Sequence, residues 1–348
     1  MTTRIRWVDQ VRALAMILIV LGHSLGQTGG EGGTVYNWLY LFHVPLCVVL
    51  SGFLFSPRNT LSDGKRYVKR VLLHEYVPYL IWGVISIVVY LVLMCRNNSA
   101  IKIGGGGYAI GLLYGNGSLG RSSTSSGLMV WNSPMWYLPF IVATEILACA
   151  ISKLLNKISS KVVLLLAVCV GMLGYYLLRL HSLFMEFETV IYLFPFFILG
   201  FLLKDIDFLK HRCNPVVGIM LVLAGSVLGK FNGAPGYLSD TYNNYLMFLV
   251  SASCICIGII SLVQYADIKC STVEYIGKNT LAILVAHKFP IMFCSIILSS
   301  VLHISIENEA VSFIAGTVVA AISIVGCLIV GRIMERICPV LIGKSTNS

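Results

Sequence analysis

The chain has 348 residues, of which 57% are hydrophobic and only 11% are charged, and its net charge is +10. An ordinary soluble domain is roughly a quarter charged and under half apolar, so the excess apolar surface must face lipid and a soluble enzyme is excluded. The basic residues lie in short clusters between apolar runs, which argues against a nucleic-acid-binding face. The eleven cysteines form no CxxC pair and lie mostly inside apolar runs, so we expect neither a disulfide framework nor a metal site.

Ten apolar runs approach the length of about 20 residues that a helix needs to cross a bilayer. They are 8–26, 35–56, 70–95, 134–151, 161–179, 187–203, 214–229, 244–263, 280–302 and 310–331. The first carries Asp9 and Arg12 and is followed by no small-residue cleavage site, so we interpret it as a retained helix and not a signal peptide. We predict an all-α polytopic transmembrane helix bundle of about ten spans, forming one integral-membrane domain over residues 1–348.

The distribution of Lys and Arg tests this count, because cytoplasmic loops are enriched in both. With the N-terminus in the cytoplasm, 18 of the 25 Lys and Arg residues fall in inside segments and 5 in outside loops. The remaining two, Arg12 and Lys288, lie within spans. This split predicts that both termini are cytoplasmic.

The longest outside loop, 96–133, is rich in Gly and Ser. Such a composition is typical of a flexible connector, and a lid over an external site is the alternative. No Lys-Ser/Thr follows the glycines at the spacing of a phosphate loop.

Charged groups in hydrocarbon cost about 2.5–3.5 kcal/mol each on insertion scales, so they usually mark a site. Arg12 and His23 are eleven positions apart on the first predicted helix, and eleven steps return to within about 20° of the starting direction, roughly 16 Å along the axis. One face therefore presents a fixed cation toward the cytoplasm and a proton-transfer group toward the outside. The alternative is that Arg12 reaches the inner headgroups and His23 caps the outer end of the helix.

Four blocks of sequence resemble the acyltransferase-3 family of membrane acyltransferases, and its fucose 4-O-acetylase-like members in particular. They are WVDQVRALA (7–15) with VLGHS (20–24), FHVPL (42–46) with LSGFL (50–54), MWYLP (135–139) with Glu145, and YIGKNTLAI (275–283) with His287. A weaker fifth match is FPFFILG (194–200). The sequence departs from the family pattern in Cys47-Val-Val, where an aromatic run is usual, and in Thr280, where Ser is commoner.

The resemblance implies transfer of an acyl group, usually acetyl from acetyl-CoA, to a hydroxyl of a sugar or glycan outside the cytoplasmic membrane. Carried over by position, His23 would be the essential base and Arg12 its partner. The reaction needs a base to take the hydroxyl proton and donors for the developing oxyanion. Ser51, Asn279 and Lys288 are candidates for those donors.

Other polar residues in the matched blocks have two interpretations each. Glu145 is either one half of a structural ion pair, with Arg12, Lys288 or a histidine, or a catalytic accessory. His43 either lines the outer mouth of the site or is a histidine at the membrane interface without a role in the site. The full set of expected substrate-binding residues is His43, Ser51, Trp136, Asn279, His287 and Lys288.

A basic cluster formed by Lys65, Arg66, Lys69 and Arg70 precedes the third span. Topology signalling or binding of anionic lipid explains it, and so do contacts to the phosphates of CoA. We carry the CoA contacts forward as the cofactor-binding prediction, with acetyl-CoA as the acyl donor and no metal.

The predicted function is therefore a membrane O-acetyltransferase that modifies a polysaccharide or other glycan, in the cytoplasmic (inner) membrane of a bacterium. Its expected partners are the acceptor, acyl-CoA and membrane lipids, with no nucleic acid. A transporter or flippase for a small or lipid-linked solute would also have many spans and intramembrane charges. A structural scaffold is a third possibility, which leaves the polar residues unexplained.

Overall fold

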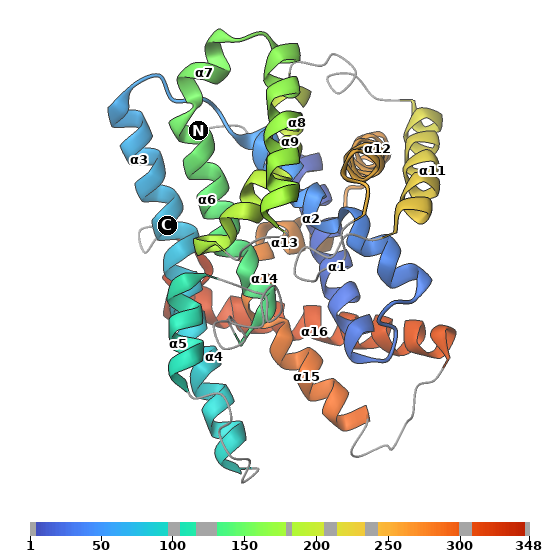
Figure 1. Cartoon of the computed structure of the whole chain (residues 1–348). Coiled ribbons are helices and arrows are strands. Elements are labelled where there is room, and N and C mark those ends of the chain that lie inside the picture. Colours follow the sequence, from blue (N-terminus) through green and yellow to red (C-terminus); the bar gives the residue numbers. More distant parts are fainter. Residues whose placement is uncertain are drawn as a thin grey trace. The chain divides into compact units, whose positions relative to one another are not determined.

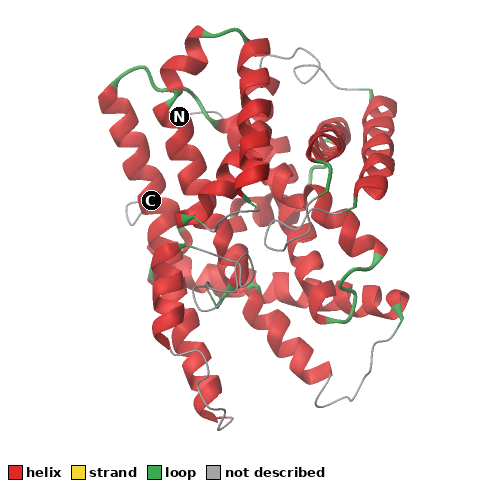
Figure 2. Cartoon of the chain, viewed as in Figure 1, coloured by secondary structure: helices red, strands yellow, loops and turns green. Residues whose placement is uncertain are grey.

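Apolar runs become helices because hydrocarbon offers no water to satisfy backbone N–H and C=O groups, which must then pair within their own segment. The computed structural model describes residues 5–96, 105–115, 131–178, 183–204, 214–233, 243–298 and 308–344. These residues form helices and connecting turns with no strand among them (Figures 1 and 2). Nine helices within the described ranges are long and apolar enough to cross a membrane, which confirms the predicted all-α transmembrane bundle.

The helices in the first half of the chain are α1 (Arg6–Gln27), α2 (Thr34–Leu54), α3 (Leu61–Val71), α4 (Val77–Arg96), α5 (Gly105–Tyr114), α6 (Tyr137–Ala150), α7 (Ser152–Lys157) and α8 (Ser160–Leu177). Those in the second half are α9 (Phe187–Leu203), α11 (Pro215–Asn232), α12 (Tyr245–Ala266), α13 (Ser271–Lys278), α14 (Thr280–Ala286), α15 (Lys288–Ile296) and α16 (Glu309–Ile337). A π-helix at Leu72–Tyr76 joins α3 to α4, and short 3₁₀ turns occupy Ser133–Trp136, Phe184–Glu186 and Pro339–Ile342.

Two predicted spans differ in the structure. The third, expected to begin at residue 70, begins at Leu61 and runs as one continuous helix to Leu93. The span expected at 280–302 is broken between α14 and α15 at His287. Pro290 is the cause, because it has no N–H and its ring excludes the carbonyl of Ala286 from helical hydrogen bonding.

The chain divides into two compact units. The first comprises Met1–Leu54, Leu199–Pro235 and Tyr242–Ile333, and the second comprises Phe55–Ile198, Gly236–Thr241 and Met334–Ser348. Each unit is assembled from separate stretches of the chain. The prediction of one domain over residues 1–348 stays a prediction.

In the first unit, α11 and α12 approach closely because glycines line their contact. A Cβ on Gly225 would lie 2.6 Å from the carbonyl oxygen of Ser251, and one on Gly258 would lie 2.7 Å from that of Gly218. The hydroxyl of Ser251 donates to the carbonyl of Gly225 at 2.9 Å. Small residues and interhelical hydrogen bonds of this kind drive helix association where no hydrophobic effect operates.

In the second unit, aromatic side chains form the core. The Phe55 ring packs against Tyr67 and Phe197 with centroid distances of 5.7 and 5.4 Å. The buried Tyr79 hydroxyl donates to the carbonyl of Leu112 at 2.7 Å, which ties α4 to α5. Helix α5 lies inside the segment 96–133 that the composition predicted as a flexible loop; the rest of its Gly- and Ser-rich part lies outside the described residues.

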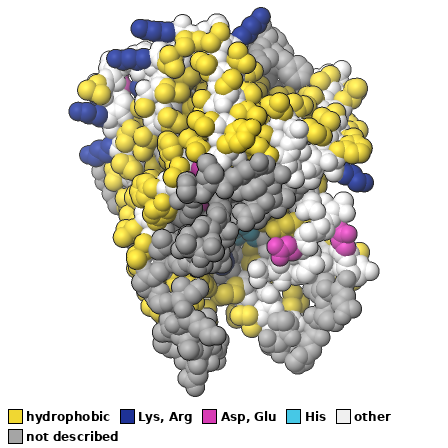
Figure 3. Space-filling model, viewed as in Figure 1, with side chains coloured by type: hydrophobic (Ala, Val, Ile, Leu, Met, Phe, Trp, Pro, Cys, Tyr) yellow, Lys and Arg dark blue, Asp and Glu magenta, His cyan; other side chains and the backbone are white. Residues whose placement is uncertain are grey.

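Apolar side chains cover much of the face shown in Figure 3. Helices α8 and α11 are the extreme cases, because only 22% and 17% of the 18-residue apolar stretch in each helix is buried. A soluble protein would not expose such surfaces to water, so these two helices face lipid.

Candidate functional site

Arg12 and His23 both lie on α1, which is continuous from Arg6 to Gln27. The helical periodicity on which the predicted shared face depends therefore extends over both positions. The Arg12 side chain is 41% exposed, and its Nη1 lies 3.9 Å from the carboxylate of the buried Asp9 one turn earlier. Sequence reasoning did not consider this partner, although its spacing of three residues was visible. Arg12 thus has an ion-pair partner on its own helix, and its side chain is still partly exposed.

Helix α13 and the turn before it hold the beginning of α1 in the first unit. The Gln10 side-chain amide donates to the carbonyl of Ile268 at 2.6 Å, and Arg6 pairs with Glu274 at 3.4 Å. A Cβ on Gly277 would lie only 2.0 Å from the carbonyl oxygen of Asp9. The close approach requires glycine at position 277, which lies in the fourth block matched in sequence.

His23 lies beside a second histidine from the far end of the chain. The ring centroids of His23 and His287 are 5.3 Å apart, at an interplanar angle of 36°. His287 is fully buried at the break between α14 and α15. Packing therefore brings the first and fourth sequence blocks together in one unit.

Two tyrosines extend this histidine cluster along α2. The Tyr40 ring meets His23 edge-on at 6.4 Å and His43 at 4.7 Å, and it stacks on Tyr36 at 4.2 Å. The buried His43 is thus part of the cluster. Neither tyrosine was a sequence candidate, although Tyr40 precedes His43 by three positions and so shares its helix face.

The hydrogen bonds of His43 and His287 determine their tautomers. Nδ1 of His43 lies 2.7 Å from the carbonyl of Leu39, and Nδ1 of His287 lies 2.9 Å from that of Ile283. A carbonyl only accepts, so Nδ1 carries the hydrogen and Nε2 of each neutral ring is a lone-pair acceptor. Nε2 of His287 is buried with no hydrogen-bond partner within the described residues. Such an acceptor is expensive to bury unless a donor reaches it.

Asn279 and Trp136 have structural contacts. The Asn279 side-chain amide donates to the carbonyl of Tyr275 at 2.8 Å where α13 meets α14. Trp136 belongs to the second unit, is 6% exposed, and packs on Phe140 at 5.4 Å. Ser51 is half-buried near the end of α2, and Lys288 begins α15. The side-chain amide of Asn279 therefore already uses one of its N–H donors within the protein.

Glu145 also belongs to the second unit, where the Tyr67 hydroxyl donates to its carboxylate at 2.9 Å. Tyr67 is in turn covered by Arg58, whose guanidinium carbon lies 4.4 Å from the ring centroid. Sequence reasoning named Arg12, Lys288 or a histidine as the partner of Glu145 and did not consider Tyr67. This arrangement favours a structural role for Glu145 within its unit.

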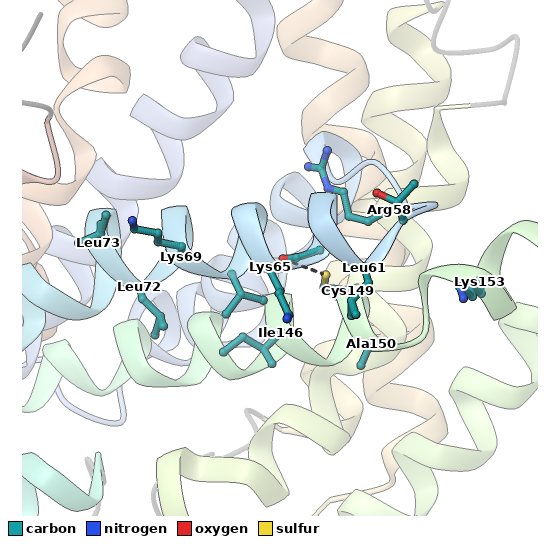
Figure 4. A pocket seen from close by; sticks show the side chains of 13 residues that line it. Arg58, Leu61, Lys65, Lys69, Leu72, Leu73, Ile146, Cys149, Ala150 and Lys153 are labelled. Carbon is teal, nitrogen blue, oxygen red and sulfur yellow. Dashed lines mark hydrogen bonds between the residues drawn. The ribbon is translucent and has the colours of Figure 1, made fainter.

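The basic cluster on α3 is divided between two helix faces. Lys65 and Lys69, one turn apart, line a groove of about 760 Å³ between α3 and the α6–α7 segment, together with Arg58 and Lys153. The groove is shown in Figure 4. Arg66 and Arg70 are exposed and are not among the residues that line it. Sequence reasoning treated these four residues of α3 as one cluster and missed Arg58 and Lys153.

Within the described ranges, no group of three or more His, Cys, Asp or Glu side chains is placed to hold a metal ion. The described histidine cluster offers ring nitrogens and tyrosine hydroxyls, which can accept and donate protons.

Residues 5–332 match the model of a family described as an acyltransferase domain, of the acyltransferase-3 type. Neither the curated proteins nor the solved structures contain a match to this chain.

Proposed function

This chain belongs to the acyltransferase-3 family and is a membrane acyltransferase, and we propose that it moves acetyl from acetyl-CoA to a hydroxyl of a sugar or glycan. The observation that carries the proposal is the histidine pair of the first unit. His23 lies 5.3 Å, centroid to centroid, from His287, whose buried Nε2 lacks a donor. An alcohol supplies that donor, and a thioester does not.

In the proposed reaction His23 is the general base. The acceptor oxygen attacks the thioester carbonyl carbon as its proton passes to the imidazole of His23. The tetrahedral intermediate collapses with cleavage of the carbon–sulfur bond, and the proton leaves with the CoA thiolate. Base catalysis of this kind typically contributes about 10²–10⁴-fold.

His287 is proposed as the group that orients the acceptor. Its Nδ1–H is already donated to the carbonyl of Ile283, so Nε2 remains an acceptor at neutral charge. A hydroxyl of the sugar bonded to Nε2 would be held close to His23. Lys288 and Ser51 are the proposed donors to the oxyanion, since the amide of Asn279 already donates to a backbone carbonyl.

For the donor, we propose that Arg66 and Arg70 contact the phosphates of CoA. They lie one turn apart on the face of α3 that does not line the groove, and guanidinium groups suit phosphate oxygens. Lys65 and Lys69, predicted with them, share the other face and receive a different assignment below.

The proposed setting is the cytoplasmic membrane of a bacterium, with both termini and segment 57–70 in the cytoplasm. The division of basic residues between the two sides supports this orientation. A cysteine introduced at Ser123 should then react with an impermeant maleimide added to intact cells, whereas one at Ser62 should react only after lysis. The reverse pattern would contradict the orientation.

The test of function is acetyl transfer by purified protein in nanodiscs, with labelled acetyl-CoA and a panel of glycans. We expect label in a glycan and an equal amount of free CoA thiol, both lost in the His23→Gln variant. The matched control is His43→Gln, because His43 donates to a backbone carbonyl as His287 does and its ring lies against Tyr40. Movement of intact solute into sealed vesicles with no CoA released would contradict acyl transfer and support a transporter.

A further inference from the structure

The groove beside α3 carries positive charge without compensation from its own lining. Four of its thirteen lining residues are cationic, namely Arg58, Lys65, Lys69 and Lys153, and no Asp or Glu lines it within the described part of the chain. The four come from three segments: the turn before α3, α3 itself and α7. Cations gathered by folding from separate segments repel one another unless an anion lies between them.

Arg58 has an unused donor at this groove. Its guanidinium is held over the Tyr67 ring at 4.4 Å from the guanidinium carbon to the ring centroid, which fixes its plane. Its Nε is buried, and the described structure provides it with no hydrogen-bond acceptor. A phosphate oxygen would satisfy this donor, because guanidinium N–H groups match the geometry of phosphate.

The opposite end of the groove is mostly apolar. Figure 4 places Leu72 and Leu73, with Lys69 beside them, away from Arg58 and Lys153, and Val68 and Ile146 add to the lining. Lys65 and Leu73 are eight residues apart on one continuous helix, or roughly 12 Å along its axis. That helix runs to Leu93 as a candidate membrane span. The cationic end therefore lies toward the start of the span and the apolar end lies deeper along it.

From this polarity we infer that the groove binds an anionic phospholipid. Its phosphate lies among Arg58, Lys65 and Lys153, and one acyl chain follows Val68, Leu72 and Leu73. Lysine and arginine near an anionic leaflet each strengthen lipid binding. The headgroup of a lipid bound in this way would lie level with the beginning of the Leu61–Leu93 helix, as expected for a lipid beside a membrane span.

CoA fits this groove less well than a phospholipid, although both carry phosphate. The arm that leads from the CoA phosphates to the thiol contains two amide groups, and buried amides need hydrogen-bond partners. At the deep end Leu72 and Leu73 offer no side-chain donor or acceptor, and Lys69 beside them offers only donors and cannot satisfy the amide N–H groups. An acyl chain needs none. The inference is independent of the reaction proposed above.

The test compares two double variants that remove equal charge from neighbouring faces of α3, about 100° apart around the helix. Lys65→Gln/Lys69→Gln alters the groove, and Arg66→Gln/Arg70→Gln is the matched control. All four side chains are exposed, so neither variant should prevent folding, which melting temperatures would check. Retention of dioleoyl phosphatidylglycerol and dioleoyl phosphatidylcholine by the purified full chain is measured by native mass spectrometry.

We expect the groove variant to weaken phosphatidylglycerol binding by roughly fivefold through Lys65, which lies at the phosphate, and by up to about thirtyfold where Lys69 contributes equally. The control and the phosphatidylcholine affinity should change by less than threefold. A steric variant, Gly64→Leu, should exclude the lipid with no change of charge, because a Cβ at this lining position meets only Cys149 at 3.5 Å. Equal losses in both double variants would overturn the proposal, and so would displacement of the lipid by CoA, which would make the groove a cofactor site.

Discussion

Replacing His23 by Gln should abolish most of the activity while the protein stays folded. Gln keeps a polar, hydrogen-bonding side chain but cannot accept and release a proton near neutral pH. If His23 is the base, turnover should fall about 10²–10⁴-fold, which corresponds to about 2.7–5.5 kcal/mol of transition-state stabilisation. Binding of acetyl-CoA should be largely unchanged, because the imidazole acts on the acceptor proton.

The ring contacts of His23 define the comparison variants. His287→Gln removes the buried acceptor 5.3 Å from His23, so it should raise the KM for the acceptor more than it lowers kcat. If His43 acts on His23 only through the Tyr40 ring, which contacts both, His43→Gln should have the smallest effect. Steady-state rates with acetyl-CoA and acceptor varied separately distinguish these outcomes.

The pH dependence provides a second readout of the same assignment. A protonated imidazole has no lone pair, so the wild-type rate should fall as the pH is lowered through the range in which His23 gains a proton. Near-normal turnover of a folded His23→Gln variant would refute the assignment. The base would then be His287, whose buried Nε2 has no hydrogen-bond partner within the described residues.

Further predictions concern Arg12, Gly277 and Cys270. If Arg12 makes oriented contacts beyond its 3.9 Å approach to Asp9, both Arg12→Ala and Arg12→Lys should lose acetyl transfer; rescue by Lys would show that it only reaches the headgroups. Gly277→Ala should lower the melting temperature by an amount equivalent to about 1–3 kcal/mol, because the new Cβ would lie 2.0 Å from a backbone oxygen of Asp9. Gly326→Ala, which meets nothing within 4 Å, should not. Backbone N–H groups in the first turn of α13 lower the pKa of the Cys270 thiol, so its alkylation should reach half its maximal rate at a lower pH in the folded protein than in the denatured chain.

The sequence alone determined the class of the molecule and one face of its first helix. Runs of about 20 apolar residues can satisfy their backbone groups in lipid only as helices, so composition was enough to predict the bundle. The eleven-residue spacing of Arg12 and His23 places both on one side of α1, because helix periodicity is a local property. The same periodicity also separates Lys65 and Lys69 from Arg66 and Arg70.

Only the tertiary structure decided what those faces meet. His287 is 264 residues from His23, and their contact depends on how α1 packs in the first unit against the helix broken near Pro290. Spans that are apolar on every side do not reveal which face is inward, since the pattern of hydrophobicity that orients a soluble helix is absent. The groove with Arg58 and Lys153 has the same origin, because α3 and the α6–α7 segment are joined by packing and not by any repeat in the sequence.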